Sequence, residues 1–118
     1  MKLQELAKKQ AVEQLVFRID PQSLERCLQI DHEIWTKGLA SQPGFAGKEV
    51  WLDPKNPDQI TYIIYWDSLE QWKAIDNEYL CALQQEFEQA FAPDSCTLIR
   101  ELHNEQQWYR THVLEMEG

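Results

Sequence analysis

The chain is poor in basic residues and in long apolar runs, and both deficits exclude classes of function. Eleven Lys and Arg stand against 20 Asp and Glu, which gives a formal net charge of −9. Nucleic-acid phosphates need clustered positive charge, so we expect no nucleic-acid partner. No apolar run approaches the roughly 20 residues of a membrane span, and no apolar signal core follows the first two residues. We therefore expect a soluble, cytoplasmic protein without a membrane partner.

Cysteine is also scarce. Cys27, Cys81 and Cys96 form an odd set without a close pair, which fits reduced thiols better than a disulfide framework or a zinc site. The three histidines share no spacing with another metal-type ligand, so we expect no metal. The sequence also lacks a glycine-rich phosphate loop, a Gly-x-Ser-x-Gly elbow and a Cys–His pair at a recognisable spacing. These absences predict a protein that holds no nucleotide and no cofactor.

What the chain does contain is one domain's worth of alternating strand and helix patterns in 118 residues. We divide it into an N-terminal extension at 1–10, a single domain at 11–114 and a tail at 115–118. Alternation, β-branched residues and turn signals place strands at 12–19, 48–52, 60–66 and 106–114. Apolar residues at three- and four-residue spacing place helices at 24–38 and 69–91. The pattern from Ser68 to Gln71 is a capping box that begins the second helix, and Asp76-Asn77 breaks this helix and caps it again. Residues 96–103 fit either a strand or a short helix.

The order of these elements is strand, helix, strand, strand, helix, strand. This is the ferredoxin-like split βαβ order, an α+β fold with an antiparallel sheet. Such a sheet carries its helices on one face only. The strand at 60–66 is largely apolar on both faces, so the open face also needs a cover. A homodimer that packs sheet against sheet is the natural cover.

Asp31 is the one residue that interrupts an otherwise apolar helix face. That face consists of Leu24, Cys27, Leu28, Asp31, Ile34, Trp35 and Gly38. Because burying an unpaired carboxylate costs several kcal/mol, two interpretations are open. Asp31 is either a structural carboxylate, at the edge of the face or satisfied by a Trp or Tyr donor, or a pocket-lining acid with a raised pKa. Pairing with Lys48 would lower the pKa instead, and the sequence does not rank the two effects.

Two segments carry a family resemblance. The first runs from Asp31 through Ile34-Trp35-Thr36 to Pro43-Gly44-Phe45 and Gly47-Lys48-Glu49-Val50-Trp51, and the second runs from Trp66 to Ile75. Together with the Pro-bearing loop between two strands, they resemble the antibiotic-biosynthesis-monooxygenase-type dimeric α/β barrels over roughly residues 11–91. More narrowly, they resemble a functionally uncharacterised branch of that superfamily that is common in cyanobacteria.

The resemblance implies a range of functions. The superfamily includes cofactor-independent monooxygenases of aromatic polyketides, haem-degrading enzymes and proteins without a known activity. Haem-degrading members use an Asn on the first strand, with a Trp and an axial His on the second helix. The matching positions here hold Gln14, Ile75 and Gln85. Because the axial ligand positions the iron, its replacement by Gln85 implies that this chain does not use haem.

We therefore expect a small-molecule-binding protein, with cofactor-independent oxygenation of an aromatic or quinone-like substrate as the candidate reaction. Asp31 is the candidate catalytic residue. The candidate pocket for a small apolar or aromatic ligand consists of Trp35, Lys48, Trp51, Tyr62, Trp66 and Trp72. The alternative is a non-catalytic dimeric module that binds a ligand or a partner. A preformed cavity beside Asp31 would favour the first function, and a core filled solidly by tryptophan would favour the second.

Overall fold

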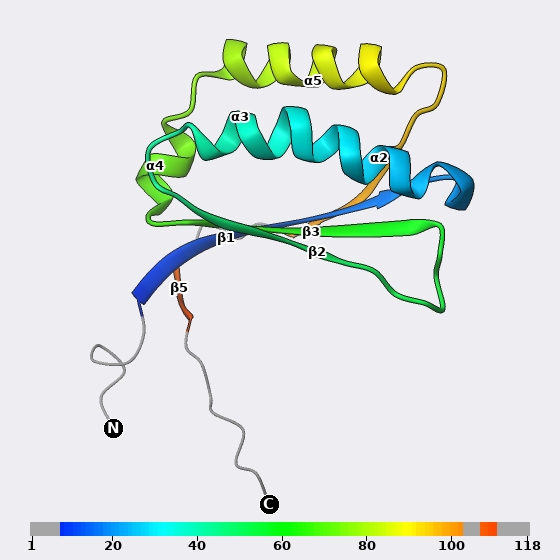
Figure 1. The fold of residues 1–118 in the computed structure, drawn as a ribbon. Coiled ribbons are helices and arrows are strands. Elements are labelled where there is room, and N and C mark those ends of the chain that lie inside the picture. Colours follow the sequence, from blue (N-terminus) through cyan, green and yellow to red (C-terminus); the bar gives the residue numbers. More distant parts are fainter. Residues whose placement is uncertain (1–7, 103–106, 111–118) are drawn as a thin grey trace, which may run out of the picture.

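One sheet carries all the helices on one of its faces (Figure 1). The structure, a computed structural model, describes residues 8–102 and 107–110. Within these residues the strands are β1 (Lys8–Arg18), β2 (Phe45–Trp51), β3 (Gln59–Trp66), β4 (Thr97–Leu102) and β5 (Gln107–Arg110). All pairs are antiparallel, in the order β2-β3-β1-β4, and β5 pairs with the first residues of β1, beyond the end of β4. The predicted ferredoxin-like order is thus confirmed, with one additional short strand.

Two helical segments pack over the sheet. The first comprises η1 (Pro21–Ser23), α2 (Leu24–Asp31), η2 (His32–Thr36) and α3 (Lys37–Ala40), and the second comprises α4 (Leu69–Lys73) and α5 (Asn77–Phe91). The predicted caps begin the second segment. Ser68 Oγ accepts a hydrogen bond from the Gln71 N–H, and Asp76 caps α5 in the same way. Within the described ranges, no helix has the length and apolar character that crossing a membrane requires.

β1 begins earlier than predicted. Residues 8–10 fall in the segment expected to be an extension, because Lys-Lys-Gln carries no strand pattern of its own. They belong to the strand because β5 pairs with residues 8–11. Residues 97–102 of the ambiguous segment form β4, and residues 107–110 of the predicted closing strand at 106–114 form β5. Residues 103, 106 and 111–114 of these two predictions lie outside the described residues. The tail at 115–118 lies outside the described residues.

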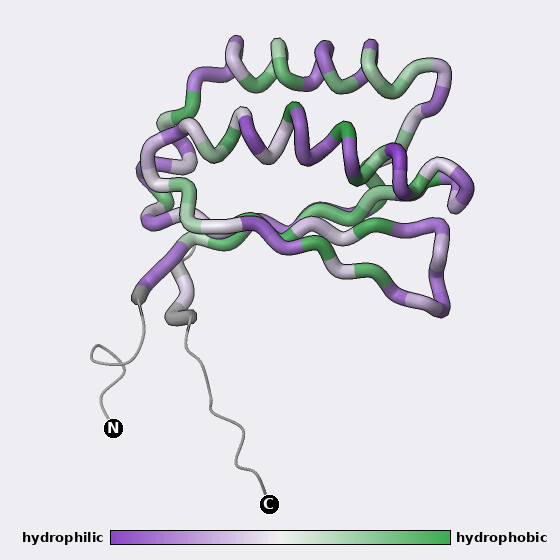
Figure 2. The backbone as a smooth tube through the Cα atoms, in the orientation of Figure 1, coloured by the Kyte–Doolittle hydropathy of each residue, from purple (hydrophilic) through white to green (hydrophobic). Residues whose placement is uncertain are grey.

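β3 positions the core by strict alternation. Its side chains at Ile60, Tyr62, Ile64 and Trp66 point toward the helices and are all buried. In the neighbouring strands, residues that pair with these four share the same face. Figure 2 shows apolar residues concentrated in the strands and alternating with polar residues along the helices. The two hydrophobic clusters of the core therefore lie between the sheet and the helices, whereas Val16 and Ile63 are buried on the opposite face of the sheet.

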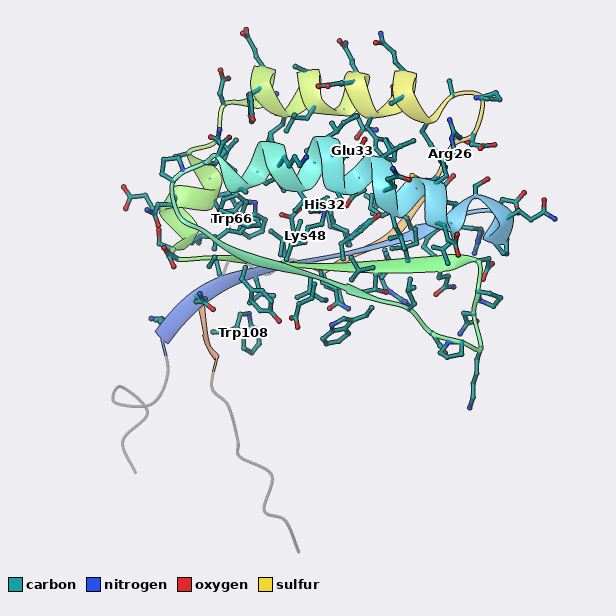
Figure 3. All side chains as sticks on the ribbon, viewed as in Figure 1. Arg26, His32, Glu33, Lys48, Trp66 and Trp108 are labelled. Atoms are coloured by element: carbon teal, nitrogen blue, oxygen red, sulfur yellow. The ribbon has the colours of Figure 1, made fainter. Side chains whose placement is uncertain are left out.

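Among the described residues, no helix lies over the opposite face of the sheet. Trp51, Leu102 and Trp108 lie on this face, as their pairing in β2, β4 and β5 requires. Their exposed fractions are 55%, 56% and 48%, respectively. Figure 3 shows Trp108 pointing away from the helices. We call these three residues the open-face cluster.

The Pro43-Gly44 turn holds the start of β2 against the start of α4. Gly44 has a φ of +88°, a left-handed conformation that L side chains disfavour. A Cβ at Gly44 would lie 2.6 Å from the Cβ of Gln71. The Gly44 carbonyl accepts a hydrogen bond of 2.7 Å from the Asp67 N–H, where β3 ends. The turn therefore fixes the position of β2 relative to α4.

We expect Gly44→Ala to lower the free energy of unfolding by about 2–4 kcal/mol, because it combines left-handed backbone strain with a clash against Gln71. Chemical denaturation followed by circular dichroism measures this loss. Pro43→Ala is the matched control in the same turn and should cost less than about 1 kcal/mol, since Pro43 is exposed. Equal losses for the two variants would contradict the prediction.

Candidate functional site

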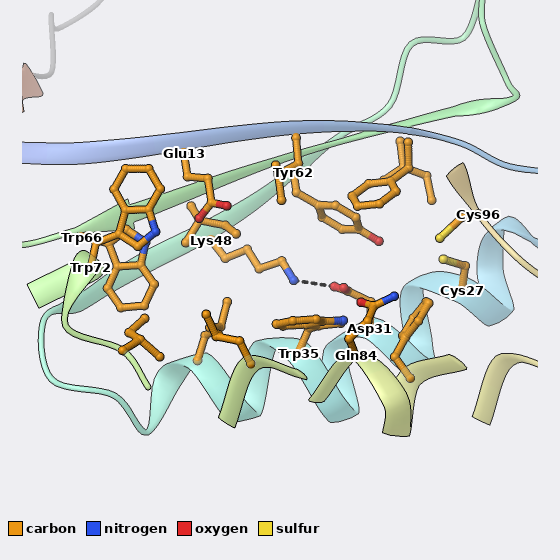
Figure 4. A pocket seen from close by; sticks show the side chains of 18 residues that line it. Glu13, Cys27, Asp31, Trp35, Lys48, Tyr62, Trp66, Trp72, Gln84 and Cys96 are labelled. Carbon is orange, nitrogen blue, oxygen red and sulfur yellow. Dashed lines mark hydrogen bonds and ion pairs between the residues drawn. The ribbon is translucent and has the colours of Figure 1, made fainter. Parts of the chain in front are cut away.

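A cavity of about 210 Å³ lies between the sheet and the helices (Figure 4). Its walls come from β1, β2 and β3 on one side and from α2, η2, α4 and α5 on the other. Six of the seven predicted site residues line it, namely Asp31, Trp35, Lys48, Tyr62, Trp66 and Trp72. The tryptophans therefore bound a preformed space rather than fill it.

Trp51 does not line this cavity, and its placement in the pocket is corrected by the structure. It pairs with Thr61 of β3 and lies on the open face, 55% exposed. Side chains along a strand point alternately to the two faces, so Trp51 and Lys48, three positions apart, must face opposite ways. The predicted alternation of β2 is confirmed, and it excludes Trp51 from the pocket.

The centre of the cavity is a buried ion pair. Lys48 Nζ donates hydrogen bonds to Asp31 Oδ2 at 2.5 Å and to Thr36 Oγ1 at 3.0 Å. The side chains of Lys48 and Asp31 are only 6% and 9% exposed. The ammonium also lies over the ring of Tyr62, 4.6 Å from its centroid, in a cation–π contact. The buried ammonium is thus surrounded by Asp31 and Thr36 of the first helical segment and by Tyr62 of β3.

A π turn in the first helix brings two of these partners together. In η2 the Lys37 N–H donates to the carbonyl of His32, five residues earlier. At about 100° per residue, positions five apart on an α-helix are separated by roughly 140° around the axis, whereas i→i+5 bonding brings them nearly into line. Asp31 and Thr36 are five positions apart. The π turn therefore lets one helix present both a carboxylate and a hydroxyl to Lys48.

Burial raises the pKa of Asp31 above its usual value, and the charge and hydrogen bond of Lys48 oppose this shift without cancelling it. Asp31 is therefore a stronger base than an exposed aspartate. Burial also raises the pKa of Tyr62, and the nearby charge of Asp31 adds to the shift. Tyr62 consequently keeps its proton at neutral pH. The sequence did not rank the effects of burial and of Lys48 on the pKa of Asp31, and in the structure the effect of burial is the larger.

Two buried donors at the cavity wall have no nitrogen or oxygen partner among the described residues: the Tyr62 hydroxyl and the Trp66 Nε1–H. Both side chains are buried, Tyr62 at 5% and Trp66 at 1% exposure. Leaving a buried donor unpaired costs about 1–3 kcal/mol, and an indole N–H can only donate. A ligand that carries hydrogen-bond acceptors, such as carbonyl oxygens, would satisfy both groups.

Sequence reasoning missed four polar or nucleophilic side chains that also line the cavity: Glu13, Cys27, Gln84 and Cys96. Glu13 has the same strand parity as Leu15, so extending the alternation of β1 by one step would have found it. Cys27 lies one helical turn before Asp31 on the same face. No local pattern points to Cys96, because its position depends on where the chain returns to the sheet after α5.

The positions that match the haem-degrading residues lie apart from one another. Ile75 lines the cavity. Gln85 is exposed on α5, and Gln14 pairs with Ile63 on the open face of the sheet. Within the part of the chain that the structure describes, no three His, Cys, Asp or Glu side chains are grouped as metal ligands.

Solved structures with the same fold come from antibiotic biosynthesis monooxygenase-like proteins. A candidate monooxygenase of this kind from Chloroflexus aurantiacus is 21% identical with a TM-score of 0.56, covering 90% of this chain and 97% of that chain. SnoaB, a cofactor-independent oxygenase from Streptomyces nogalater, is 11% identical with a TM-score of 0.52, covering 93% and 99%. A candidate monooxygenase from Caulobacter crescentus is 11% identical with a TM-score of 0.57, covering 86% and 94%. No family model and no curated protein matches the chain. The resemblance read from the sequence is confirmed at the level of the fold.

Removing Lys48 should expose the cost of burying Asp31. Lys48→Met removes the group that lowers the pKa of Asp31, so burial raises that pKa further. A carboxyl group with a raised folded-state pKa contributes stability at low pH and loses it as the pH rises through that pKa. We expect a loss of about 3–5 kcal/mol near pH 8 and a smaller loss near pH 5, measured by urea denaturation.

Two further variants make this test specific. Lys37→Met removes an exposed ammonium from the same helical segment and should change the stability by less than about 0.5 kcal/mol at either pH. The double variant Asp31→Asn with Lys48→Met should lose the added pH dependence, because no titrating carboxyl remains. A loss from Lys48→Met that is identical at both pH values would rule out this account of the pair.

Proposed function

We propose that the chain is a small-molecule-binding protein that oxygenates an aromatic or quinone-like substrate without a cofactor. The observation that carries the proposal is the preformed cavity beside Asp31, with tryptophan side chains at its walls. SnoaB, a cofactor-independent oxygenase, has the same fold, which supports the oxygenase half of the proposal. The odd number of cysteines supports a cytoplasmic location.

In such a reaction the substrate itself supplies the electrons that reduce oxygen. Asp31 takes a proton from an acidic CH₂ group of the substrate, and the carbanion adds to O₂ to give a peroxide anion. The anion recovers a proton from Asp31, and loss of water from the hydroperoxide leaves a carbonyl group. One oxygen atom enters the product and the other leaves as water. The protein therefore needs only a base and a water-shielded pocket.

The remaining polar groups would stabilise the charge that this reaction creates. The carbanion of a quinone-like substrate carries its negative charge largely on oxygen. The Lys48 ammonium, the Tyr62 hydroxyl and the Trp66 N–H are fixed donors at the cavity wall, and such donors stabilise a developing oxyanion. The apolar remainder of the wall would exclude water and strengthen these interactions.

The alternative function is a non-catalytic module that binds the same kind of ligand. One observation favours it: Asp31 Oδ2 is already bonded to the Lys48 ammonium, which lowers the pKa of Asp31 and makes it a weaker base than burial alone would. The two functions predict different behaviour toward oxygen, whereas both require that the cavity holds a small molecule.

We expect Asp31→Asn to lower the free energy of unfolding by several kcal/mol, because it leaves the Lys48 ammonium buried without its counter-ion. The folded variant should still bind the ligand, and its turnover should fall at least about 100-fold, because the base is lost while the shape of the side chain is kept. Small molecules that co-purify with the wild-type protein would be identified by mass spectrometry and returned to both proteins in an oxygen electrode. Glu33→Gln, an exposed carboxylate on the same helical segment, is the matched control. Equal oxygen uptake by Asp31→Asn would remove Asp31 from the mechanism. A ligand that binds wild type without oxygen uptake would establish the non-catalytic module.

We also propose that two copies of the chain pack through their open sheet faces. The open-face cluster of Trp51, Leu102 and Trp108 exposes two tryptophans and a leucine on one surface. Large exposed apolar patches on soluble proteins mark interaction sites. A second copy would cover the same surface on both partners, since a two-fold dimer interface is self-complementary.

Sedimentation should therefore give a particle of about twice 14.0 kDa at micromolar concentration. We expect Trp51→Glu to weaken the dimer, because it places a charge at the centre of an apolar contact. Val50→Glu is the matched control, since Val50 is exposed on the same strand but faces the other way. A wild-type monomer would contradict the proposal, as would equal effects of the two variants.

A further inference from the structure

Cys27 and Cys96 lie far apart in the sequence but meet at one end of the cavity. Cys27 is on α2 and is 1% exposed, and Cys96 directly precedes β4 and is half-buried. Both line the cavity, and Figure 4 shows their sulfur atoms facing one another. The proposed oxygenase chemistry gives neither thiol a role. The third cysteine, Cys81, is exposed on α5.

The side chain of Arg26 holds the two segments that carry Cys27 and Cys96 next to each other. Arg26, next to Cys27, donates hydrogen bonds to the backbone carbonyls of residues 90–92 at the end of α5. It also donates to Asp94 Oδ2 at 2.7 Å. These bonds tie the segment that leads into Cys96 to the helix that carries Cys27. The two thiols are therefore brought together by a fixed structural contact.

The two thiols differ in acidity because each affects the other. Interaction with Cys96, together with burial, raises the pKa of Cys27. A hydrogen bond from the Cys27 thiol to the Cys96 sulfur lowers the pKa of Cys96, against the opposing effects of burial and of the Asp31 charge. A second deprotonation would place two negative charges side by side, so the pair carries one thiolate at a time. Cys96, which keeps contact with solvent, is the nucleophile of the pair.

We propose that Cys27 and Cys96 form a redox-active dithiol that hydrogen peroxide converts into a disulfide across this end of the cavity. The Cys96 thiolate attacks a peroxide oxygen, the O–O bond breaks, and hydroxide leaves and is protonated to water. The Cys27 sulfur then attacks the resulting sulfenic acid, and the displaced hydroxide takes the Cys27 proton. The two sulfurs lose two electrons, the peroxide gains two, and two water molecules form.

This modification goes beyond the proposed function, since it needs neither a substrate nor turnover. The disulfide would join α2 to the strand at the sheet edge, beside Asp31 and Tyr62. The oxidation state of the pair would thereby set the shape of the polar end of the cavity. A reductant that acts on disulfides would restore the dithiol.

The experiment uses the full chain with Cys81→Ser, which removes the exposed thiol that could cross-link two molecules. After treatment with one equivalent of hydrogen peroxide, we expect the mass to fall by two hydrogen atoms. Non-reducing digestion should yield a linked peptide that contains Cys27 and Cys96. The melting temperature should rise by roughly 5–15 °C, because the cross-link closes a long loop of the unfolded chain, and dithiothreitol should reverse the rise.

Two variants in the same background separate the roles of the thiols. Cys27→Ala should stop at a sulfenic acid on Cys96, which dimedone traps, whereas Cys96→Ser should give neither product. In the wild-type chain, limiting iodoacetamide should modify Cys96 before Cys81, although Cys81 is the more exposed. The proposal is overturned if peroxide leaves both thiols free, or oxidises Cys96 to the sulfinic acid while Cys27 stays reduced. Because no readout involves a ligand or oxygen uptake, failure of the oxygenase function would leave these results unchanged.

Discussion

The pairing of Asp31 with Lys48 inside an apolar cavity is the interaction on which the arrangement of the site depends. Each of these charges would cost several kcal/mol if it were buried alone, so the first helix and β2 must hold them in contact. The turn at Gly44 fixes β2, and the π turn of η2 adds the hydroxyl of Thr36. The ring of Tyr62 lies beneath the ammonium. The polar end of the cavity is therefore one connected unit.

Much of this arrangement follows from local patterns in the sequence. Strand alternation places Lys48 and Tyr62 on the face that the helices cover, and three- and four-residue spacing places Asp31 on the helix face that meets them. The capping residues Ser68 and Asp76 begin α4 and α5 where they were expected. These signals are reliable because each depends on residues within a few positions of one another. The fold could accordingly be predicted, and six of the seven predicted site residues line the cavity.

What could not be predicted depends on contacts between distant parts of the chain. The additional length of β1 comes from pairing with β5, almost a hundred residues later in the sequence. The position of Cys96 depends on the hydrogen bonds of Arg26 at the end of α5. Trp51 is a different case. The alternation of side chains along β2 places Trp51 on the face opposite to Lys48, so the pattern of its own strand already excluded it from the pocket. The sign of the pKa shift of Asp31 required the relative strength of burial and pairing, which only the three-dimensional arrangement provides.

The π turn also changes the rotational phase between the two halves of the first helix, both of which contact α5. Its C-terminal half packs closely on α5, where the Tyr79 hydroxyl donates a hydrogen bond of 2.8 Å to the carbonyl of Gly38. Its N-terminal half carries Asp31 toward the sheet. In a regular α-helix a rotation that suits one contact would displace the other, since the two faces have a fixed angular offset. The additional residue in the π turn changes the angle between the two faces around the helix axis, so both contacts can form. One continuous helix can therefore present Asp31 to Lys48 of the sheet and the carbonyl of Gly38 to Tyr79 of α5.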